Sequence, residues 1–309
     1  MSENLTNSKV AVLLTCHNRV KKTLLSLKSL YEAVDYYNKR ANDNIEISVF
    51  LTDDGCTDGT SDNVTSTFHN KNISIVKANG NAFWAGGMRI AWDYAINTGS
   101  EYDFFLLIND DTILKQDCVI ELLNTHLYSI EHYSKGGIYS GFVGSFDDEN
   151  VIIYGAKSYT KSFWVKAESL KPNGKPQKCA MVNANILMVC KDVVNSIGIL
   201  DDIYIHAAAD MDYGIRAQKA GFPVLTTSKI CACCEYDHPN SDSEREKVVN
   251  MSLKERKEFL ERPNIKQYHD SLIFYKRYDK VRYYIFALSY YLNLYLPSLY
   301  YFLNKKRGH

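Results

Sequence analysis

A run of five apolar residues that stops at three polar ones is the feature that most constrains this chain. Residues 104–108 (Phe-Phe-Leu-Leu-Ile) are too few to indicate a helix and favour a strand buried on both faces, as in a parallel sheet. Asn109, Asp110 and Asp111 follow directly. Ligands of open α/β sheets bind beyond the carboxyl ends of the strands, so a phosphate-bearing substrate and a divalent cation would meet here. A polar turn that caps the next helix is the alternative.

Two earlier apolar segments are also predicted to be strands, and each is followed by polar residues. Residues 9–15 and 45–52 are apolar runs of strand length, and an amphipathic helix follows the first. The second run ends in Asp53 and Asp54, whose carboxylates could hold a ribose hydroxyl or the edge of a base. A tight turn in which Asp58 caps the next helix explains the same residues, so both interpretations stay open at this point.

A glycine-rich segment follows a third short strand, residues 73–77. Residues 79–89 contain three glycines and two aromatic residues, and a helix is predicted over residues 90–98. We expect a loop whose backbone approaches a ligand closely while Trp84 offers a flat face. Trp84 as a staple at the helix start is the alternative. Neither the Gly-x-Gly-x-x-Gly fingerprint nor a Gly-Lys-Ser/Thr loop occurs in the sequence, which argues against NAD or ATP held in those ways.

The middle of the chain continues as an alternation of strands and helices. The patterns predict a helix over residues 118–130 and a strand over 138–144. They then predict a polar-faced hairpin, formed by 151–156 and 162–167, and a strand over 181–189 that returns to the sheet.

A second acidic segment opens a later helix. Residues 209–220 have a helical pattern, and Asp210 lies in the first turn, where the helix dipole favours an ionised carboxylate. Such a group could accept a proton from a substrate hydroxyl, although first-turn charge preference alone also explains it. Strands are predicted over residues 222–226 and 231–238, the second of which ends at His238.

Charge and cysteine content narrow the function classes. Lys+Arg 36 and Asp+Glu 36 leave no net charge, so nucleic acid is not an expected partner. Most of the eight cysteines lie in apolar, strand-like runs, and the cluster at residues 231–234 lacks a second pair at zinc-finger spacing. Residues 1–9 lack the apolar core of a signal peptide. We therefore expect reduced thiols in a cytoplasmic protein.

The composition changes toward the C-terminus. Residues 240–263 are charged, and residues 283–303 are rich in Tyr, Leu and Phe with cations on both sides. Asn293 and Pro297 interrupt this run, which argues against a simple membrane-spanning helix. A helix at the lipid interface and a helix pair packed on the domain are both consistent with the pattern.

Taken in order, these motifs resemble those of the inverting family 2 glycosyltransferases with the GT-A fold, in particular the rhamnosyltransferase-like members of bacterial polysaccharide assembly, such as O-antigen or capsule synthesis. The resemblance runs from residue 10 to residue 238. Five segments carry it: Thr-Cys-His-Asn-Arg at 15–19, Asp-Asp-Gly-Cys-Thr-Asp-Gly-Thr at 53–60, the glycine-rich 79–87, Asn-Asp-Asp at 109–111, and Ala-Asp-Met-Asp with a later Arg and Gly at 209–221.

The resemblance implies an α/β GT-A fold with a mostly parallel central sheet, helices on both faces and an aromatic-rich helical extension. The corresponding domains are a glycosyltransferase domain over residues 1–240, a charged flap or connector over 241–267, and the extension over 268–309.

The resemblance also assigns site residues. Mn²⁺ or Mg²⁺ would be held by Asp111, with His238 as a second ligand, and Asn109 stands where the family's metal motif has its first Asp. Asp210 takes the role of the catalytic base, with Asp212 as the fallback, and Ala209 replaces the usual Glu. The nucleotide sugar would be bound by Thr15, Asn18, Arg19, Asp53, Asp54, Asn81, Trp84, Gly86, Gly87, Asn109 and Asp110.

The implied reaction moves a sugar from a UDP- or dTDP-linked donor to a glycan or lipid-linked acceptor with inversion. We expect a cytoplasmic hexosyltransferase, with peripheral contact to the inner face of the plasma membrane through residues 276–307. A sugar nucleotidyltransferase and a catalytically inactive, sugar-nucleotide-binding scaffold are the alternatives. The first is disfavoured because residues 15–19 carry no glycine-rich phosphate loop, and the second is kept open by Ala209 and Asn109.

Overall fold

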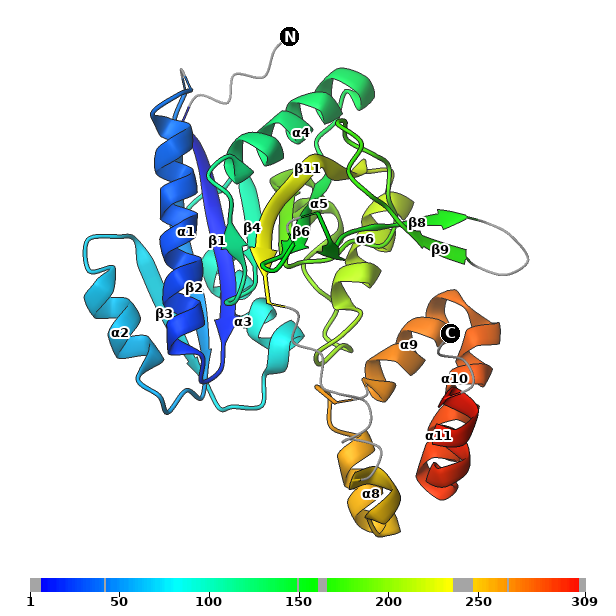
Figure 1. The fold of residues 1–309 in the computed structure, drawn as a ribbon. Coiled ribbons are helices and arrows are strands. Elements are labelled where there is room, and N and C mark those ends of the chain that lie inside the picture. The colour runs from blue at the N-terminus through cyan, green and yellow to red at the C-terminus, as the bar shows by residue number, and fades with distance from the viewer. Residues whose placement is uncertain are drawn as a thin grey trace. The chain divides into compact units, whose positions relative to one another are not determined.

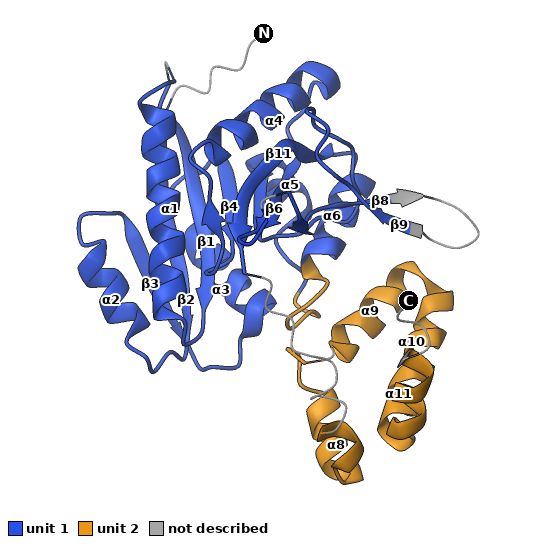
Figure 2. Cartoon of the chain, viewed as in Figure 1, with its two compact units in different colours: residues 1–201, 210–236 blue, residues 202–209, 237–309 orange. Residues whose placement is uncertain are grey.

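The computed structural model describes residues 7–41, 43–148, 150–160, 166–235, 247–265 and 267–305. The chain divides into two compact units (Figure 2). The first unit comprises residues 1–201 and 210–236. The second, which we call the C-terminal unit, comprises residues 202–209 and 237–309 and so includes a segment from the middle of the chain. The predicted domain boundary at residue 240 lies outside the described residues.

The first unit is built on a nine-stranded mixed sheet with the order β3-β2-β1-β4-β10-β6-β11-β5, and β7 pairs with β6 (Figure 1). Its first four strands in this order run parallel, whereas β10 runs antiparallel to both β4 and β6. The strands are β1 Ser8–Cys16, β2 Ile45–Asp54, β3 Ile73–Ala78, β4 Phe104–Ile108, β5 Ile113–Leu114, β6 Ile138–Ser145, β7 Ile152–Tyr154, β10 Ile186–Cys190 and β11 Val224–Cys234.

Helices cover both faces of this sheet, as the resemblance implied (Figure 1). On β4, Phe105 packs against Trp92 of α3, while its neighbour Leu106 points to the opposite face, toward α1 and α4. All five residues of β4 are therefore buried, which explains the unbroken apolar run. The helices of this unit are α1 Val20–Asn38, α2 Thr60–Thr67, α3 Phe83–Asn97, α4 Cys118–Tyr133, α5 Lys191–Ile197 and α6 Ala209–Lys219.

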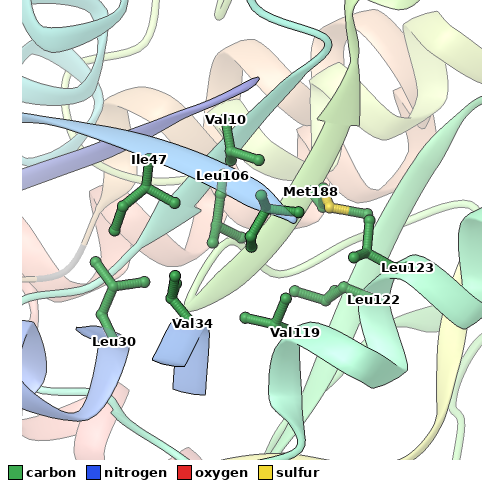
Figure 3. Close-up of a pocket in the computed structure, with 10 residues that line it drawn as sticks. Val10, Leu30, Val34, Ile47, Leu106, Val119, Leu122, Leu123 and Met188 are labelled. Atoms are coloured by element: carbon green, nitrogen blue, oxygen red, sulfur yellow. The ribbon is translucent and has the colours of Figure 1, made fainter. Parts of the chain in front are cut away.

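The α1 and α4 face contains a small apolar cavity (Figure 3). Side chains such as Leu30 of α1, Leu106 of β4 and Val119 of α4 line a space of about 10 Å³. An apolar space of this size offers no partners for a water molecule. It is a packing gap in the core and not a ligand site.

Several predicted elements differ from the structure. The strand expected over residues 181–189 is the shorter β10, which begins at Ile186. Helix α3 begins at Phe83 and not at residue 90, so the glycine-rich segment supplies its first turns. Residues 152–154 of the predicted hairpin form β7 on the main sheet, and a separate pair is formed by β8 Lys157–Thr160 and β9 Lys166–Ser169. Residues 162–165 of the predicted hairpin lie outside the described residues. The two strands expected over 222–226 and 231–238 are joined in a single long β11, which keeps its pairing with β6 through register shifts. Residues 236–238 lie outside the described residues.

The C-terminal unit has a helical core of its own. It contains α8 Leu253–Leu260, α9 Tyr268–Tyr278, α10 Lys280–Tyr295 and α11 Pro297–Lys305. Leu260, Tyr268 and Leu294 are buried together. Pro297 is the first residue of α11, a position where its missing N–H and fixed φ are tolerated. Among the described helices, none combines the length and hydropathy needed to cross a bilayer.

Candidate active site

The polar residues after β1, β2 and β4 meet at one edge of the sheet, because these strands are parallel and adjacent. The register pairs Cys16 at the end of β1 with Asp53 at the end of β2. The last pair of β4 and β10 joins Ile108 to Ile186, so the segment before β10 lies beside the polar end of β4. The carboxyl edge of the sheet therefore carries the candidate site.

Backbone hydrogen bonds connect the two acidic segments at this edge. The Asn109 N–H donates to the Asn185 carbonyl at 3.3 Å. One residue earlier, the Ala184 N–H donates to Asp210 Oδ2 at 3.2 Å. Asn109 and Asp210 are thus each hydrogen-bonded to the 184–185 segment, and the role of Asp210 as the base stays a prediction. Residues 184 and 185 make these contacts through their backbone N–H and carbonyl groups. Every residue carries such groups, so no side-chain pattern in the sequence predicts the contacts.

Arg19 lies between the two aspartates that follow β4. Its Nη1 atom is 2.8 Å from Asp111 Oδ2 and 3.4 Å from Asp110 Oδ1. Asp110 is only 6% exposed, and burial raises its pKa to about 7, although Arg19 acts in the opposite direction. Asp111 is the more accessible of the two carboxylates. The pair therefore offers one solvent-facing carboxylate and one that is readily protonated near neutral pH.

Asn109 and Trp84 form a direct contact within the site. The Trp84 Nε1–H donates to Asn109 Oδ1 at 2.8 Å. Trp84 is half-buried in the first turn of α3, so its indole is fixed against the end of β4. Stacking of this ring on a sugar stays a prediction. Through this hydrogen bond the side-chain oxygen of Asn109 anchors the indole of Trp84 at the site.

Asp53 uses its carboxylate inside the protein. It is 1% exposed, lies 2.5 Å from Lys77 Nζ, and accepts hydrogen bonds from Ser61 Oγ and from the Cys56 N–H at 2.7 Å. Burial alone would raise its pKa, but these donors outweigh burial and lower the pKa to about 2. Asp53 is therefore ionised at neutral pH and fixes the turn after β2.

Asp54 organises the glycine-rich segment. Its carboxylate accepts hydrogen bonds from the backbone N–H groups of Gly80, Ala82 and Phe83 at 2.8, 3.1 and 2.9 Å. These bonds hold the entry to α3, where Phe83 has a positive φ of 52°. In the structure, the two aspartates that end β2 shape the backbone of the site, and direct contact with a nucleoside stays a prediction.

The turns after β1 and β2 are joined to each other. Asn18 has a φ of 52°, and its Oδ1 accepts a hydrogen bond from the Thr57 N–H at 2.7 Å. Thr15 packs against Gly87 of α3, where an added Cβ would come within 2.7 Å of the Thr15 Cβ. Gly87 is thus required for close packing of a helix on a strand, and not for the loop expected from the sequence. Gly86 and the exposed Asn81 lie in the same segment.

The structure separates the two candidate bases. Asp212 is 0% exposed and lies 2.8 Å from Arg216 Nε, and Arg216 also donates to the carbonyls of Ile197 and Ile199. Asp210 is only partly buried, and its hydrogen-bond donors are the Met211 and Ala184 N–H groups. Burial raises the pKa of Asp210, which those amides oppose. A carboxylate that is held by neutral donors and has a raised pKa is the better proton acceptor.

The donor set after β4 fits a magnesium-type ion bound mainly by its substrate. Asp111 offers an accessible carboxylate, and Mg²⁺ commonly uses one or two carboxylates together with phosphate oxygens. Within the described residues, no group of three His, Cys, Asp or Glu side chains is arranged to hold a metal by itself. His238, the predicted second ligand, lies outside the described residues.

Comparison with solved structures gives neighbours of the same architecture. A mannosyltransferase from Pyrobaculum calidifontis, solved with GDP-Man and Mn²⁺, matches with a TM-score of 0.51 and 12% identity over 97% of this chain and 84% of its own. TarS (residues 1–349) from S. aureus, solved with UDP-GlcNAc, matches with a TM-score of 0.52 and 13% identity over 87% of this chain and 71% of its own. At such identities the likeness shows the fold alone, and that fold is the GT-A fold of glycosyltransferases.

The sequence itself identifies the family. The model described as "Glycosyl transferase family 2" matches residues 11–195, which is more than half of the 309-residue chain. The chain therefore belongs to glycosyl transferase family 2. A comparison with curated proteins returns no match.

Proposed function

We propose that this protein is an inverting hexosyltransferase that moves a sugar from a UDP- or dTDP-linked donor to a glycan or lipid-linked acceptor. In a single displacement, the acceptor hydroxyl oxygen bonds to the anomeric carbon as the bond to the diphosphate breaks. Asp210 accepts the hydroxyl proton, and the nucleoside diphosphate leaves with the electron pair. The motif resemblance supports a rhamnosyltransferase-like member that acts in polysaccharide assembly.

The observation that carries this proposal is the placement of Asp210. Its carboxylate is hydrogen-bonded by Ala184, one residue from the carbonyl that holds Asn109. This supports a proton acceptor at Asp210 that would lie near the segment expected to hold the donor diphosphate. Positioned general bases typically contribute about 10²- to 10⁴-fold to a rate. Buried Asp212, paired with Arg216, instead supports the helix that carries Asp210.

The donor would be held by groups from three strand ends. The turns that Asp53, Asp54 and Asn18 organise would receive the nucleoside, and Trp84 would face the sugar. Asp111 would hold Mn²⁺ or Mg²⁺, which when bound would stabilise the negative charge of the diphosphate. Arg19, already 2.8 Å from Asp111, would contact the same phosphates.

The proposed lipid-linked acceptor is suggested by the exposed surface of the C-terminal unit. Helices α10 and α11 and the residue between them, Leu296, expose apolar side chains. On the helices these are Val281, Tyr284, Ile285, Leu288, Tyr291, Tyr295, Leu299, Phe302 and Leu303. The sequence has no Asp or Glu after Asp279, and Lys276, Arg277 and Lys280 are exposed beside this surface. An apolar, aromatic surface with neighbouring cations suits the interface of an anionic membrane. The protein would then meet a lipid-linked acceptor at the inner face of the plasma membrane.

The test of the proposal compares two substitutions in α6. Asp210→Asn keeps the shape of the side chain and should retain binding of UDP or dTDP while transfer falls by at least about 10²-fold. Asp212→Asn should instead lower the melting temperature, because it leaves Arg216 without its buried counter-charge. Donor binding is measured by thermal shift and transfer by released nucleotide. Near-normal turnover in Asp210→Asn would remove Asp210 from the mechanism.

The scaffold alternative has two specific observations in its favour: Ala209 and Asn109 replace acidic residues of the family pattern. A scaffold would bind a nucleotide sugar without consuming it. Release of free UDP or dTDP by the wild-type protein would exclude the scaffold, and pyrophosphate exchange would instead identify a nucleotidyltransferase.

A further inference from the structure

The segment that leads into α6 has a strained backbone. Residues 202–208 form turns and bends, and Ala208 has a φ of 61°. This is the left-handed region, which is unfavourable for a residue that carries a Cβ atom. Such a conformation persists only where surrounding contacts hold it. Helix α6 begins at the next residue, Ala209, and Asp210 is its second residue.

One carboxylate from α9 makes these contacts. Asp270 is 1% exposed and accepts hydrogen bonds from three successive backbone N–H groups: those of Ile205 at 3.1 Å, His206 at 2.7 Å and Ala207 at 2.7 Å. His269 Nδ1 lies 2.8 Å from Asp270 Oδ1. The last of the three N–H groups belongs to the residue immediately before Ala208. Asp270 therefore holds the segment at the point where its backbone is strained.

The protonation state of Asp270 favours this arrangement. Burial acts to raise its pKa, but the hydrogen bonds from His269 and the three amides outweigh burial, and the pKa is lowered. The carboxylate is therefore ionised at neutral pH. Hydrogen bonds to an ionised acceptor are shorter and stronger than neutral ones, in keeping with the 2.7 Å distances.

We propose that Asp270 is a positioning residue for Asp210. Its carboxylate fixes residues 205–207, and through the covalent chain it sets where α6 begins and how Asp210 meets the acceptor hydroxyl. The inference rests on the proposed role of Asp210 as the base. The donor would be held by residues that follow β1, β2 and β4, so loss of the Asp270 contacts should affect transfer and leave donor binding intact.

The test is Asp270→Asn in the full-length protein, a substitution that keeps the side-chain volume but replaces one acceptor oxygen with a donor. We expect kcat to fall by about 10- to 100-fold, the scale of a 1 Å misplacement in an active site. The donor KM and the dissociation constant of the nucleotide should stay within about twofold, since this variant leaves the donor-binding segments unchanged. Amide hydrogen exchange of residues 203–208 should become faster.

The matched control is Asp279→Asn in the same unit. Asp279 caps α10 by accepting a hydrogen bond from the Arg282 N–H at 3.1 Å, and Asn serves equally well at such a position. This control should keep the wild-type kcat and the wild-type exchange of residues 203–208.

Several outcomes would overturn the inference. Wild-type kcat in folded Asp270→Asn would do so, and so would an equal loss of donor binding and kcat, which indicates a general structural role. If Asp270→Asn does not fold, exchange in the wild-type protein decides: protection of the amides of residues 205–207 supports the inference, and exchange at the rate of exposed loops refutes it. If Asp210→Asn is inactive while Asp270→Asn has normal activity, the positioning role of Asp270 is refuted and the role of Asp210 as the base is retained. A fully active Asp210→Asn removes the proposed base itself.

Discussion

At the scale of single residues, Asp110 makes the stability of this protein depend on pH. Its pKa is raised from 3.8 to about 7 in the folded state, so the folded protein binds a proton that the unfolded chain releases. The free energy of unfolding therefore falls as the pH rises from about 4 to 7, and the cost is complete above 7.

Asp110→Asn should remove this dependence. Near pH 8, we expect the melting temperature to rise by about 2–4 °C, the shift that corresponds to ~1 kcal/mol in a domain of this size. Near pH 4 the variant and the wild type should melt alike. Asp111→Asn is the control, because that carboxylate is more exposed and directly paired with Arg19. Equal melting temperatures for Asp110→Asn and wild type at pH 8 would contradict the assigned pKa shift.

Asp111 is the proposed metal ligand, so removal of the metal should affect activity. EDTA should suppress transfer and Mn²⁺ should restore it, because one accessible carboxylate and a diphosphate together provide the oxygen ligands such ions require. Asp111→Asn should raise the Mn²⁺ concentration needed for half-maximal rate by about tenfold or more, the scale of a lost ligand contact of ~1.4 kcal/mol. Full activity in EDTA would mean that Arg19 and other cations neutralise the leaving group unaided.

At the scale of secondary-structure elements, the contact of α3 with β1 depends on one glycine. An added Cβ at Gly87 would overlap the Thr15 side chain, whereas one at Gly86 would have 3.5 Å to its nearest neighbour. Gly87→Ala should therefore destabilise the protein by about 1–3 kcal/mol, as overpacked cores are. Gly86→Ala should be neutral or slightly stabilising, because Ala is the better helix former. Urea unfolding of both variants tests the prediction, and equal midpoints would refute it.

The elements that were predicted correctly from the sequence are those with an unambiguous hydrophobic pattern. The apolar run at residues 104–108 became β4 with unchanged bounds, because burial on both faces leaves no place for polar residues. The start of α3 was wrong because Gly86 and Gly87 indicate a loop locally, and only the approach of Thr15 explains a helical glycine. Likewise, the motif resemblance favours Asp210 as the base and keeps Asp212 as the fallback, whereas the burial of Asp212 and its ion pair with Arg216 are visible only in the structure.

At the scale of the whole molecule, the exposed apolar surface of α10 and α11 predicts membrane association. The double substitution Leu288→Ser and Tyr291→Ser should leave the fold intact, since both side chains are more than half exposed. Burial of a large apolar side chain contributes roughly 1.5–3 kcal/mol, so binding to vesicles that contain anionic lipid should fall by about tenfold or more per residue.

Sedimentation with such vesicles measures this binding. The control is Leu25→Ser with Tyr94→Ser, which removes exposed apolar side chains of the first unit and should change nothing. If the wild-type protein does not bind anionic vesicles, or if both double variants bind as it does, the membrane proposal is wrong.

The division of the chain into units was the least accessible from sequence. No local pattern connects Asp270 with a segment 63 residues earlier, and an aspartate in a first helical turn is ordinary by itself. That connection has a consequence for the order of events during synthesis. A ribosome releases residues 205–207 well before Asp270, so a nascent chain can complete its sheet while the approach to α6 lacks its anchor. Full transfer activity would then arrive late, with the final helices, and a chain interrupted before residue 270 would engage its donor but transfer the sugar slowly.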